Sequence, residues 1–278
     1  FIVIMKILIL GANGMLGHAL INAFANEDIM VGDLPEFDIT KTEDLKLKIK
    51  GFKPEIVINA AAFTKVDECE AKKNLCNQIN GEAVGDLAKI CKDLNAILVH
   101  YSTDYVFDGN KKEGYLETDQ TKPVNAYGAS KELGEKLLQK NTAGFYLIRT
   151  AWLYGPFGKN FVDTIIELAL KQKEIKVVND QFGNPTYAKD LAQATKQILI
   201  DKPAFGIYHR TNAQDCSWHE LAEKIKEIMG LTAELIPVSS AEFPMAAKRP
   251  QYSKLLNTKL PELRSWTEAL EEYLKLKS

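Results

Sequence analysis

The stretch KILILGANGMLG, residues 6–17, joins a short apolar run to three glycines, Gly11, Gly14 and Gly17. The apolar run predicts a buried strand, and the helical pattern of residues 14–24 follows it at once. A Gly-x-x-Gly-x-x-Gly turn lets the backbone bend tightly and approach a pyrophosphate, whose charge then rests on the helix N-terminus. Because this turn lies in the first strand–turn–helix unit of the chain, it predicts a dinucleotide-binding fold.

The alternation of strands and helices continues through the first 150 residues. Apolar runs at 55–60, 96–102 and 144–149 predict strands buried on both faces, and the segments 81–94 and 129–140 predict amphipathic helices. Continuous apolar strands between helices are typical of a parallel sheet with both faces covered. We therefore expect an α/β fold with a Rossmann-type doubly wound parallel sheet.

After Arg149 the alternation of strands and helices becomes less regular, and glycine, proline and aromatic residues cluster. We expect a Rossmann domain over residues 5–150, which also receives about 178–203. Residues 151–177 and 204–278 are expected to form a smaller mixed α/β substrate-binding lobe.

Three helix starts fit the capping-box pattern, in which a hydroxyl and a carboxyl bind free backbone amides. They are Thr40 to Glu43, Ser217 to Glu220 and Ser265 to Glu268.

Composition and charge exclude some classes of protein. The chain has 278 residues, 46% of them hydrophobic and 26% charged, with a formal net charge of −2. This balance gives no reason to expect binding to nucleic acid or to an anionic membrane surface. The opening FIVIMKILIL is too short to span a bilayer, so we expect a first strand from Met5 onward, with Phe1 to Ile4 as an extension.

The four cysteines form no Cys-x-x-Cys pair and have no histidine at metal-ligand spacing. We expect reduced thiols that pack in the interior of a cytoplasmic protein. These cysteines are Cys69, Cys76, Cys91 and Cys216.

Asp33 lies 22 residues after Gly11, at the end of the second expected strand. A carboxylate there can accept hydrogen bonds from the adenosine ribose, and its charge would repel a 2′-phosphate. No arginine lies between Gly11 and Arg149 to bind such a phosphate, although Lys41 could contribute. NADH is therefore expected to be accepted and NADPH stays open. The alternative is an aspartate that is merely solvated in a turn.

Tyr127 and Lys131, in NAYGASKELGE, lie four residues apart and share one face of an expected helix. Thr103, in YSTDYVFDG, should lie at the carboxyl end of the fourth strand. A phenol has a pKa of about 10, and a nearby ammonium can lower it by roughly one to three units. Tyr127 could then protonate an alkoxide, Thr103 could orient a carbonyl, and Lys131 could also hold the nicotinamide ribose.

Eight motifs, spread nearly from end to end of the chain, together resemble one known family. They are GANGMLG, NAAAFTKVDECE, STDYVFDG, PVNAYGASKELGE, RTAWLYG, NFVDTI, DQFGNPTYAKDLA and KRPQYSKL. The chain resembles the dTDP-4-dehydrorhamnose reductases, within the extended short-chain dehydrogenases/reductases. The resemblance implies reduction of the C4 ketone of dTDP-4-dehydro-L-rhamnose by NADH or NADPH, giving dTDP-L-rhamnose.

The resemblance also implies residue roles. The catalytic set would be Thr103, Tyr127 and Lys131. The cofactor would contact these three groups of residues: Gly11, Asn13, Gly14, Met15, Leu16 and Gly17; Asp33, Asp38 and Ile39; and Ala62, Phe63, Thr64, Tyr127 and Lys131. The dTDP-linked 4-keto-6-deoxy sugar would contact Thr103, Asp104, Trp152 and Arg249, with Asn160 and Gln181 as weaker candidates. Arg249 suits diphosphate oxygens because its guanidinium is a planar fork; its alternative is a surface salt bridge.

One position departs from the pattern. Some family members carry a glutamate two residues after the third glycine and use it in a metal-bridged dimer, whereas this chain has Ala19. We therefore expect no structural metal and leave a homodimer open.

Two other functions compete with the reductase. One is a non-catalytic subunit like the regulatory subunit of methionine adenosyltransferase, which shares this fold and much of the motif set. The other is a nucleotide-sugar epimerase or dehydratase of the same superfamily. The intact set of Thr103, Tyr127 and Lys131 argues against a non-catalytic subunit. Asp104 directly follows Thr103, where a dehydratase would carry an acidic residue, so this position does not by itself exclude a dehydratase.

Overall fold

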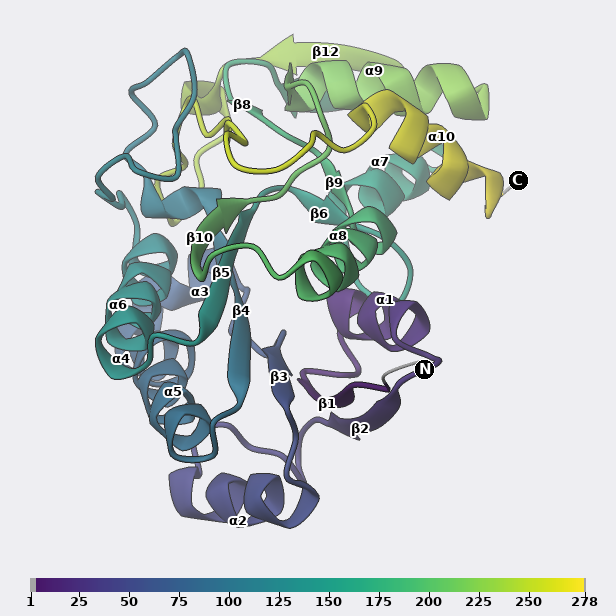
Figure 1. Cartoon of the computed structure of the whole chain (residues 1–278). Coiled ribbons are helices and arrows are strands. Elements are labelled where there is room, and N and C mark those ends of the chain that lie inside the picture. The colour runs from purple at the N-terminus through teal and green to yellow at the C-terminus, as the bar shows by residue number, and fades with distance from the viewer. Residues whose placement is uncertain (1–3, 278) are drawn as a thin grey trace.

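The central element of the computed structural model, which describes residues 4–277, is a six-stranded parallel sheet. Its strand order is β10-β5-β4-β3-β1-β2, so the chain winds outward in both directions from β1 and β3 (Figure 1). The strands are β1 (Lys6–Leu10), β2 (Asp28–Gly32), β3 (Ile56–Asn59), β4 (Ile97–Thr103), β5 (Phe145–Thr150) and β10 (Gly206–His209). This confirms the Rossmann-type doubly wound sheet.

Helices cover both faces of the sheet and bury its apolar side chains. On one face, α1 (Met15–Ala23) and α8 (Ala188–Asp201) enclose a core with β-strand residues such as Ile9 and Val99. The other face is covered by α2 (Thr42–Phe52), α5 (Ala83–Asp93) and α6 (Ala126–Asn141). This double cover explains the continuous apolar runs of the strands, because neither face meets water.

Short helices follow β3 and β4, next to the carboxyl edge of the sheet. After β3 come α3 (Val66–Ala71), α4 (Lys73–Asn77) and the π-helical turn η1 (Gln78–Glu82), and all three contact α6. The 3₁₀ turn η2 (Asp104–Val106) follows β4 and also contacts α6. α6 is therefore held from several sides.

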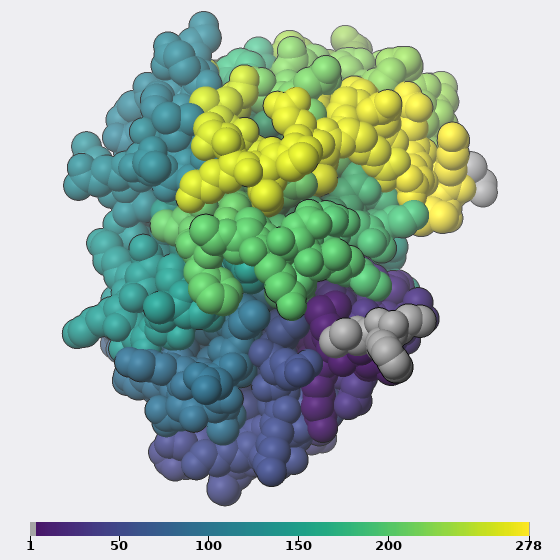
Figure 2. All heavy atoms as spheres, viewed as in Figure 1, coloured from purple at the N-terminus to yellow at the C-terminus, as the bar shows by residue number. Residues whose placement is uncertain are grey.

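A second core forms above the sheet from the later part of the chain. Its elements are β6 (Leu153–Tyr154), α7 (Phe161–Ala169), β7 (Glu174–Val178), β8 (Phe182–Gly183), β9 (Thr186–Tyr187), β11 (Cys216–Ser217), α9 (Trp218–Met229), β12 (Glu234–Val238), η3 (Ser240–Glu242) and α10 (Trp266–Lys275). β12 pairs with β7 in parallel, and β11 pairs with β8 antiparallel. In Figure 2 the C-terminal residues cover the upper part of the visible face. These elements share one cluster of buried hydrophobic side chains.

The boundary of the smaller lobe differs from the prediction in one place. β10 falls within residues 204–278, yet it pairs in parallel with β5, with Gly206 beside Tyr146. Strand β10 thereby extends the main sheet beyond β5, so these residues belong to the Rossmann sheet.

Two of the three predicted capping boxes are confirmed. Ser217 and Ser265 each exchange hydrogen bonds with the glutamate three residues later. The prediction for Thr40 is wrong, because its hydroxyl donates to Asp38 at 2.7 Å and α2 begins after Lys41 without a side-chain cap.

The cysteine prediction is also partly wrong. Cys69 on α3 and Cys76 on α4 form a disulfide, with their Cα atoms 5.7 Å apart. The sequence contained no signal for this bond, because the turn between two short helices brings the sulfur atoms together. Cys91 and Cys216 are free and buried, as expected.

Within residues 4–277, no helix is both long enough and apolar enough to cross a bilayer. The expectation for Phe1 to Val3 falls outside the described residues, and Ile4 is exposed.

Candidate active site

The glycine loop after β1 has the geometry that a bound pyrophosphate requires. Gly11 has φ of +76°, and a Cβ there would lie 2.5 Å from the backbone nitrogen of Ala61. A Cβ on Gly17 would meet the carbonyl oxygen of Gly11. Gly14 is the N-cap of α1 and offers no side-chain cap, so the first amides of this helix have no side-chain acceptor. The residues present therefore fit a dinucleotide.

Asp33 follows β2 directly and binds the glycine loop. Its carboxylate accepts hydrogen bonds from the backbone amides of Asn13 and Leu34, both at 2.7 Å. The alternative of a merely solvated turn aspartate does not describe this side chain, because it connects the end of β2 to the loop. Its position matches that of a ribose-binding carboxylate.

The remaining predicted cofactor residues lie on three different segments. Asp38 accepts the backbone amide of Thr40 at 3.0 Å, and the hydrogen bond from the hydroxyl of Thr40 lowers the pKa of Asp38. Ile39 is buried in the core beside α2, and Leu16 is buried in the core beside α1. Met15 lies against Gly155 and Gly158, whose lack of side chains leaves room for it.

Asn80, which the sequence did not single out, connects the predicted cofactor loop to α6. It accepts a hydrogen bond from the amide of Phe63 at 2.8 Å and donates to its carbonyl at 3.0 Å. It also donates to the Ser130 hydroxyl at 3.0 Å, and Ser130 donates to the carbonyl of Tyr127 at 2.7 Å. A lone asparagine in a helix carries no sequence signal for this role. Ala62 and Thr64 flank the residue that Asn80 holds.

The three predicted catalytic residues come from the end of β4 and the first turns of α6. Thr103 ends this strand and lies close enough to Tyr127 for its hydroxyl to lower the pKa of the phenol. α6 begins next to Tyr127 because Asn125 caps it, accepting the amide of Gly128 at 2.7 Å. Lys131 lies one turn further on the same helix and is 2% exposed.

The electrostatics of Tyr127 differ from the expectation. Burial raises its pKa, the negative charge of Asp104 raises it further, and only the hydrogen bond with Thr103 lowers it. Lys131 donates instead to the carbonyl oxygen of Tyr101 at 2.6 Å, so its ammonium is directed to the backbone of β4. The prediction that Lys131 lowers the pKa of Tyr127 is not met in this arrangement.

Lys131 and Asp104 are also shifted by burial. Burial lowers the pKa of Lys131 from 10.5 to about 8, although the carboxylate of Glu135 opposes this. Burial raises the pKa of Asp104 from 3.8 to about 6, although the nearby hydroxyl groups of Ser253 and Thr103 oppose this. The Thr103 hydroxyl donates to one carboxylate oxygen of Asp104 at 2.9 Å, while Oδ2 is buried without a partner. Asp104 thus has a free acceptor beside the catalytic set.

Trp152 is held in a fixed and strained position. Its φ of 45° lies in the left-handed region, which a bulky residue rarely adopts. Its ring stacks on Trp218 at 3.5 Å between centroids, and a Cβ on Gly183 would lie 2.6 Å from the indole. Strain that is maintained by packing on two sides is common at binding sites.

Arg249 is engaged by a carboxylate of the protein itself. Its guanidinium donates to both oxygens of Asp67, at 2.8 and 2.7 Å, and to the carbonyl of Ala247. Burial raises the pKa of Tyr105, and the nearby charge of Arg249 opposes this rise; the Tyr105 ring meets the Tyr127 ring edge-on at 5.9 Å. The salt-bridge alternative for Arg249 is therefore realised, in a bidentate geometry that also suits a phosphate.

The two weaker substrate candidates are not placed alike. Asn160 caps α7, accepting the amide of Asp163 at 3.0 Å and donating to the carbonyl of Gly155 at 3.0 Å. Gln181 directly precedes β8 and lies in no such cap.

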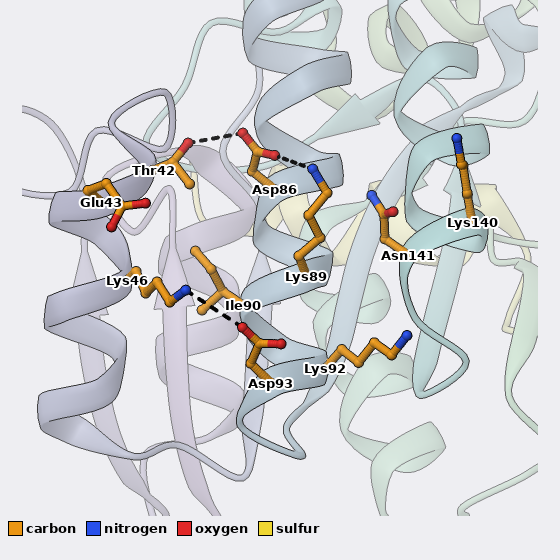
Figure 3. Close-up of a pocket in the computed structure, with 10 residues that line it drawn as sticks. All are labelled: Thr42, Glu43, Lys46, Asp86, Lys89, Ile90, Lys92, Asp93, Lys140 and Asn141. Carbon is orange, nitrogen blue, oxygen red and sulfur yellow. Dashed lines mark hydrogen bonds and ion pairs between the residues drawn. The ribbon is translucent and has the colours of Figure 1, made fainter.

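Two cavities lie away from this cluster. One, of about 510 Å³, opens between α2 and α5 and reaches the end of α6, where Lys92 and Lys140 border it (Figure 3). The other, of about 420 Å³, lies between α8 and residues 260–264. Neither contains a predicted site residue. In residues 4–277, no group of three or more His, Cys, Asp or Glu side chains is placed to hold a metal ion.

Comparisons with known proteins agree with this geometry. Residues 5–278 match the model of the RmlD substrate binding domain family. A dTDP-4-dehydrorhamnose reductase of Burkholderia thailandensis is 40% identical, over 93% of this chain and 92% of the relative. The spore coat polysaccharide biosynthesis protein SpsK of Bacillus subtilis is 39% identical over 98% of both chains. The solved dTDP-4-dehydrorhamnose reductase of Bacillus anthracis, in complex with NADP, is 37% identical with a TM-score of 0.95, over 99% of this chain and 100% of the other. The chain therefore belongs to the RmlD substrate binding domain family.

Proposed function

We propose that this protein reduces the C4 ketone of dTDP-4-dehydro-L-rhamnose to the alcohol of dTDP-L-rhamnose. The observation that carries the proposal is the approach of Tyr127 to Thr103, with Lys131 one turn further along the same helix, in a fold whose glycine loop leaves no room for side chains at Gly11 and Gly17. The names of its relatives in the family support the sugar nucleotide as substrate.

Each residue of the site has a role that its surroundings permit. When bound, NADH or NADPH supplies the hydride. Thr103 hydrogen-bonds the ketone oxygen once its hydroxyl proton turns away from Asp104, and Tyr127 donates its phenolic proton to that oxygen as it becomes an alkoxide. An alkoxide is a stronger base than a phenolate, so this transfer is favourable even for a phenol whose pKa is raised. Lys131 offers its remaining N–H groups to the nicotinamide ribose.

Recognition of the substrate rests on residues outside the catalytic set. Asp104 accepts a sugar hydroxyl through its unpartnered Oδ2. Trp152 presents its indole to the deoxysugar, and Arg249 binds the diphosphate once Asp67 releases it. Asp33 favours NADH because its charge opposes a 2′-phosphate, whereas the complex of the Bacillus anthracis relative with NADP supports NADPH. A cytoplasmic location and a homodimer stay predictions.

A single substitution tests the proposal. Tyr127→Phe removes the proton donor and keeps the ring, so turnover should fall by about two to four orders of magnitude while NADH binding is retained. The assay follows NADH and NADPH oxidation with a panel of 4-keto-6-deoxy sugar nucleotides. Unchanged turnover in this variant would refute Tyr127 as proton donor. Net consumption of NADH also excludes an epimerase or dehydratase, which return the hydride to their substrate.

A further inference from the structure

Behind Lys131, a buried row of polar side chains connects three elements. Asn59 ends β3, His100 lies in β4, and the two are partners in the parallel register. Asn59 Nδ2 lies 3.2 Å from His100 Nδ1, and His100 Nε2 lies 3.4 Å from Lys131 Nζ. Asn59 and His100 are each 1% exposed, so water does not take the place of any of these partners.

The orientation of Asn59 is fixed by the backbone. Its Oδ1 accepts the amide of Ala61 at 3.1 Å, which leaves the NH₂ group facing the imidazole of His100. An NH₂ group can only donate, so Nδ1 of His100 must be an acceptor. In a neutral imidazole the proton then resides on Nε2, the nitrogen that faces Lys131.

The imidazole is kept neutral by its surroundings. Burial lowers the pKa of His100 well below 6.5, the charge of Lys131 lowers it further, and the backbone of Asn59 opposes both effects only in part. Nε2–H of His100 consequently points at Lys131. Two donors oppose one another when Lys131 is an ammonium, whereas the lone pair of a neutral amine can accept this N–H. The carbonyl of Tyr101 accepts another N–H of Lys131 in either state.

We propose that Asn59 and His100 are positioning residues for Lys131: Asn59 fixes the tautomer in which His100 presents Nε2–H to the amine, which disfavours the third proton of Lys131. This inference rests on the proposed function, in which Lys131 belongs to the catalytic set. With this arrangement the Lys131 ammonium can release a proton near neutral pH. A buried ammonium bonded only to acceptors would hold its proton more tightly.

Other groups around Lys131 act differently. Glu135, one turn further along α6, favours the ammonium. Asp104 from η2 acts on Tyr127, and from α4 and η1 the polar groups of Cys76 and Asn80 bond to Ser130. The Nε2–H of His100 is thus the contact that opposes the ammonium directly.

The first experiment reads the tautomer without any turnover. In protein labelled with ¹⁵N-histidine, the two-bond ¹H–¹⁵N spectrum separates the two neutral tautomers and the imidazolium, and the His100 signals are assigned by their loss in His100→Gln. The expected result between pH 6 and 9 is a neutral imidazole with the proton on Nε2. A proton on Nδ1, or an imidazolium, would overturn the proposal whether or not the protein is a reductase.

The second experiment reverses the polarity with one nearly isosteric change. In Asn59→Asp the new carboxylate can still accept the Ala61 amide, and it accepts from Nδ1–H of His100, so the Nε2 lone pair faces Lys131. The alkaline limb of kcat/KM, or of the NADH dissociation constant, should move up by about one pH unit or more. Asn141→Asp adds the same charge at the far end of α6, where Asn141 bonds to Gly85, and should leave the limb in place.

The outcomes separate the tautomer from simple charge. A proton that moves to Nδ1 together with a raised limb supports the proposal. If the alkaline limb of the pH profile rises without a change of tautomer, the effect comes from charge alone and the proposal is overturned. An alkaline limb that does not move, or that moves to lower pH, also overturns the proposal. If Asn59→Asp does not fold, the spectrum of the unmodified protein still decides the tautomer.

Discussion

At the scale of single residues, burial sets the protonation states of the site. It lowers the pKa of Lys131 to about 8 and raises that of Asp104 to about 6. Burial also raises the pKa of Tyr127, which therefore keeps its proton throughout the neutral range. Between about pH 6 and 8 the site thus holds a carboxylate, an ammonium and a phenol together, and the proposed reduction uses the carboxylate as acceptor and the phenol as proton donor.

The raised pKa of Asp104 predicts an acid limit to substrate binding. Below about pH 6 the carboxyl group is protonated and loses an acceptor for sugar hydroxyls, so the KM for the sugar nucleotide should rise as the pH falls through 6. In Asp104→Asn this pH dependence should disappear, at the cost of a higher KM throughout. Steady-state kinetics between pH 5 and 8 measure both effects. An acid limb that persists in the variant would assign it to another group.

The lowered pKa of Lys131 predicts a cost in stability. A shift from 10.5 to about 8 disfavours the folded, charged state by about 3 kcal/mol at pH 7. Lys131→Met should therefore unfold at a higher urea concentration than the unmodified protein at pH 7, while losing activity. Between pH 8 and 10.5 the unfolded chain binds more protons, so the stability of the unmodified protein should rise and the difference should shrink. A difference that is independent of pH would contradict this account.

At the scale of elements, α6 is fastened to the sheet by a buried ion pair. Glu135 on α6 accepts two hydrogen bonds from Arg149 on β5, at 3.0 and 2.7 Å, and both side chains are almost fully buried. Ser102 on β4 donates to the same carboxylate at 2.5 Å. Because Glu135 lies one turn after Lys131, this pair sets how α6 presents Tyr127 and Lys131 to β4.

Breaking this pair should destabilise the protein strongly. Arg149→Met leaves the Glu135 carboxylate buried without its partner, which typically costs about 3–5 kcal/mol. The double variant with Glu135→Leu should recover most of that loss, because two apolar side chains of similar size need no counter-charge. Urea unfolding of both single variants and the double variant measures the coupling. Additive losses would show that the two side chains do not depend on one another.

At the scale of the whole molecule, contacts between segments far apart in the chain are what the sequence alone could not predict. The glycine loop, the buried strands and the shared helix face of Tyr127 and Lys131 follow from local patterns, since each depends on spacing within one strand, turn or helix. Asn80 carries no such pattern, because its partners lie 17 and 50 residues away. The pairing of Arg249 with Asp67 spans 182 residues and joins the C-terminal segment to α3.

That long-range pair leads to a prediction about substrate affinity. Asp67 fills the guanidinium fork of Arg249 with a carboxylate, so an incoming diphosphate must compete with it. Asp67→Asn replaces the charged acceptor with a neutral one, and the KM for the sugar nucleotide should fall by roughly three- to tenfold, with NADH affinity unchanged. Glu68→Gln is a matched control, since it removes the same charge from α3 but pairs with Lys65 and Lys72. A KM that rises in Asp67→Asn, together with a lower melting temperature, would mean that Asp67 serves to fasten the C-terminal segment and does not compete with the substrate.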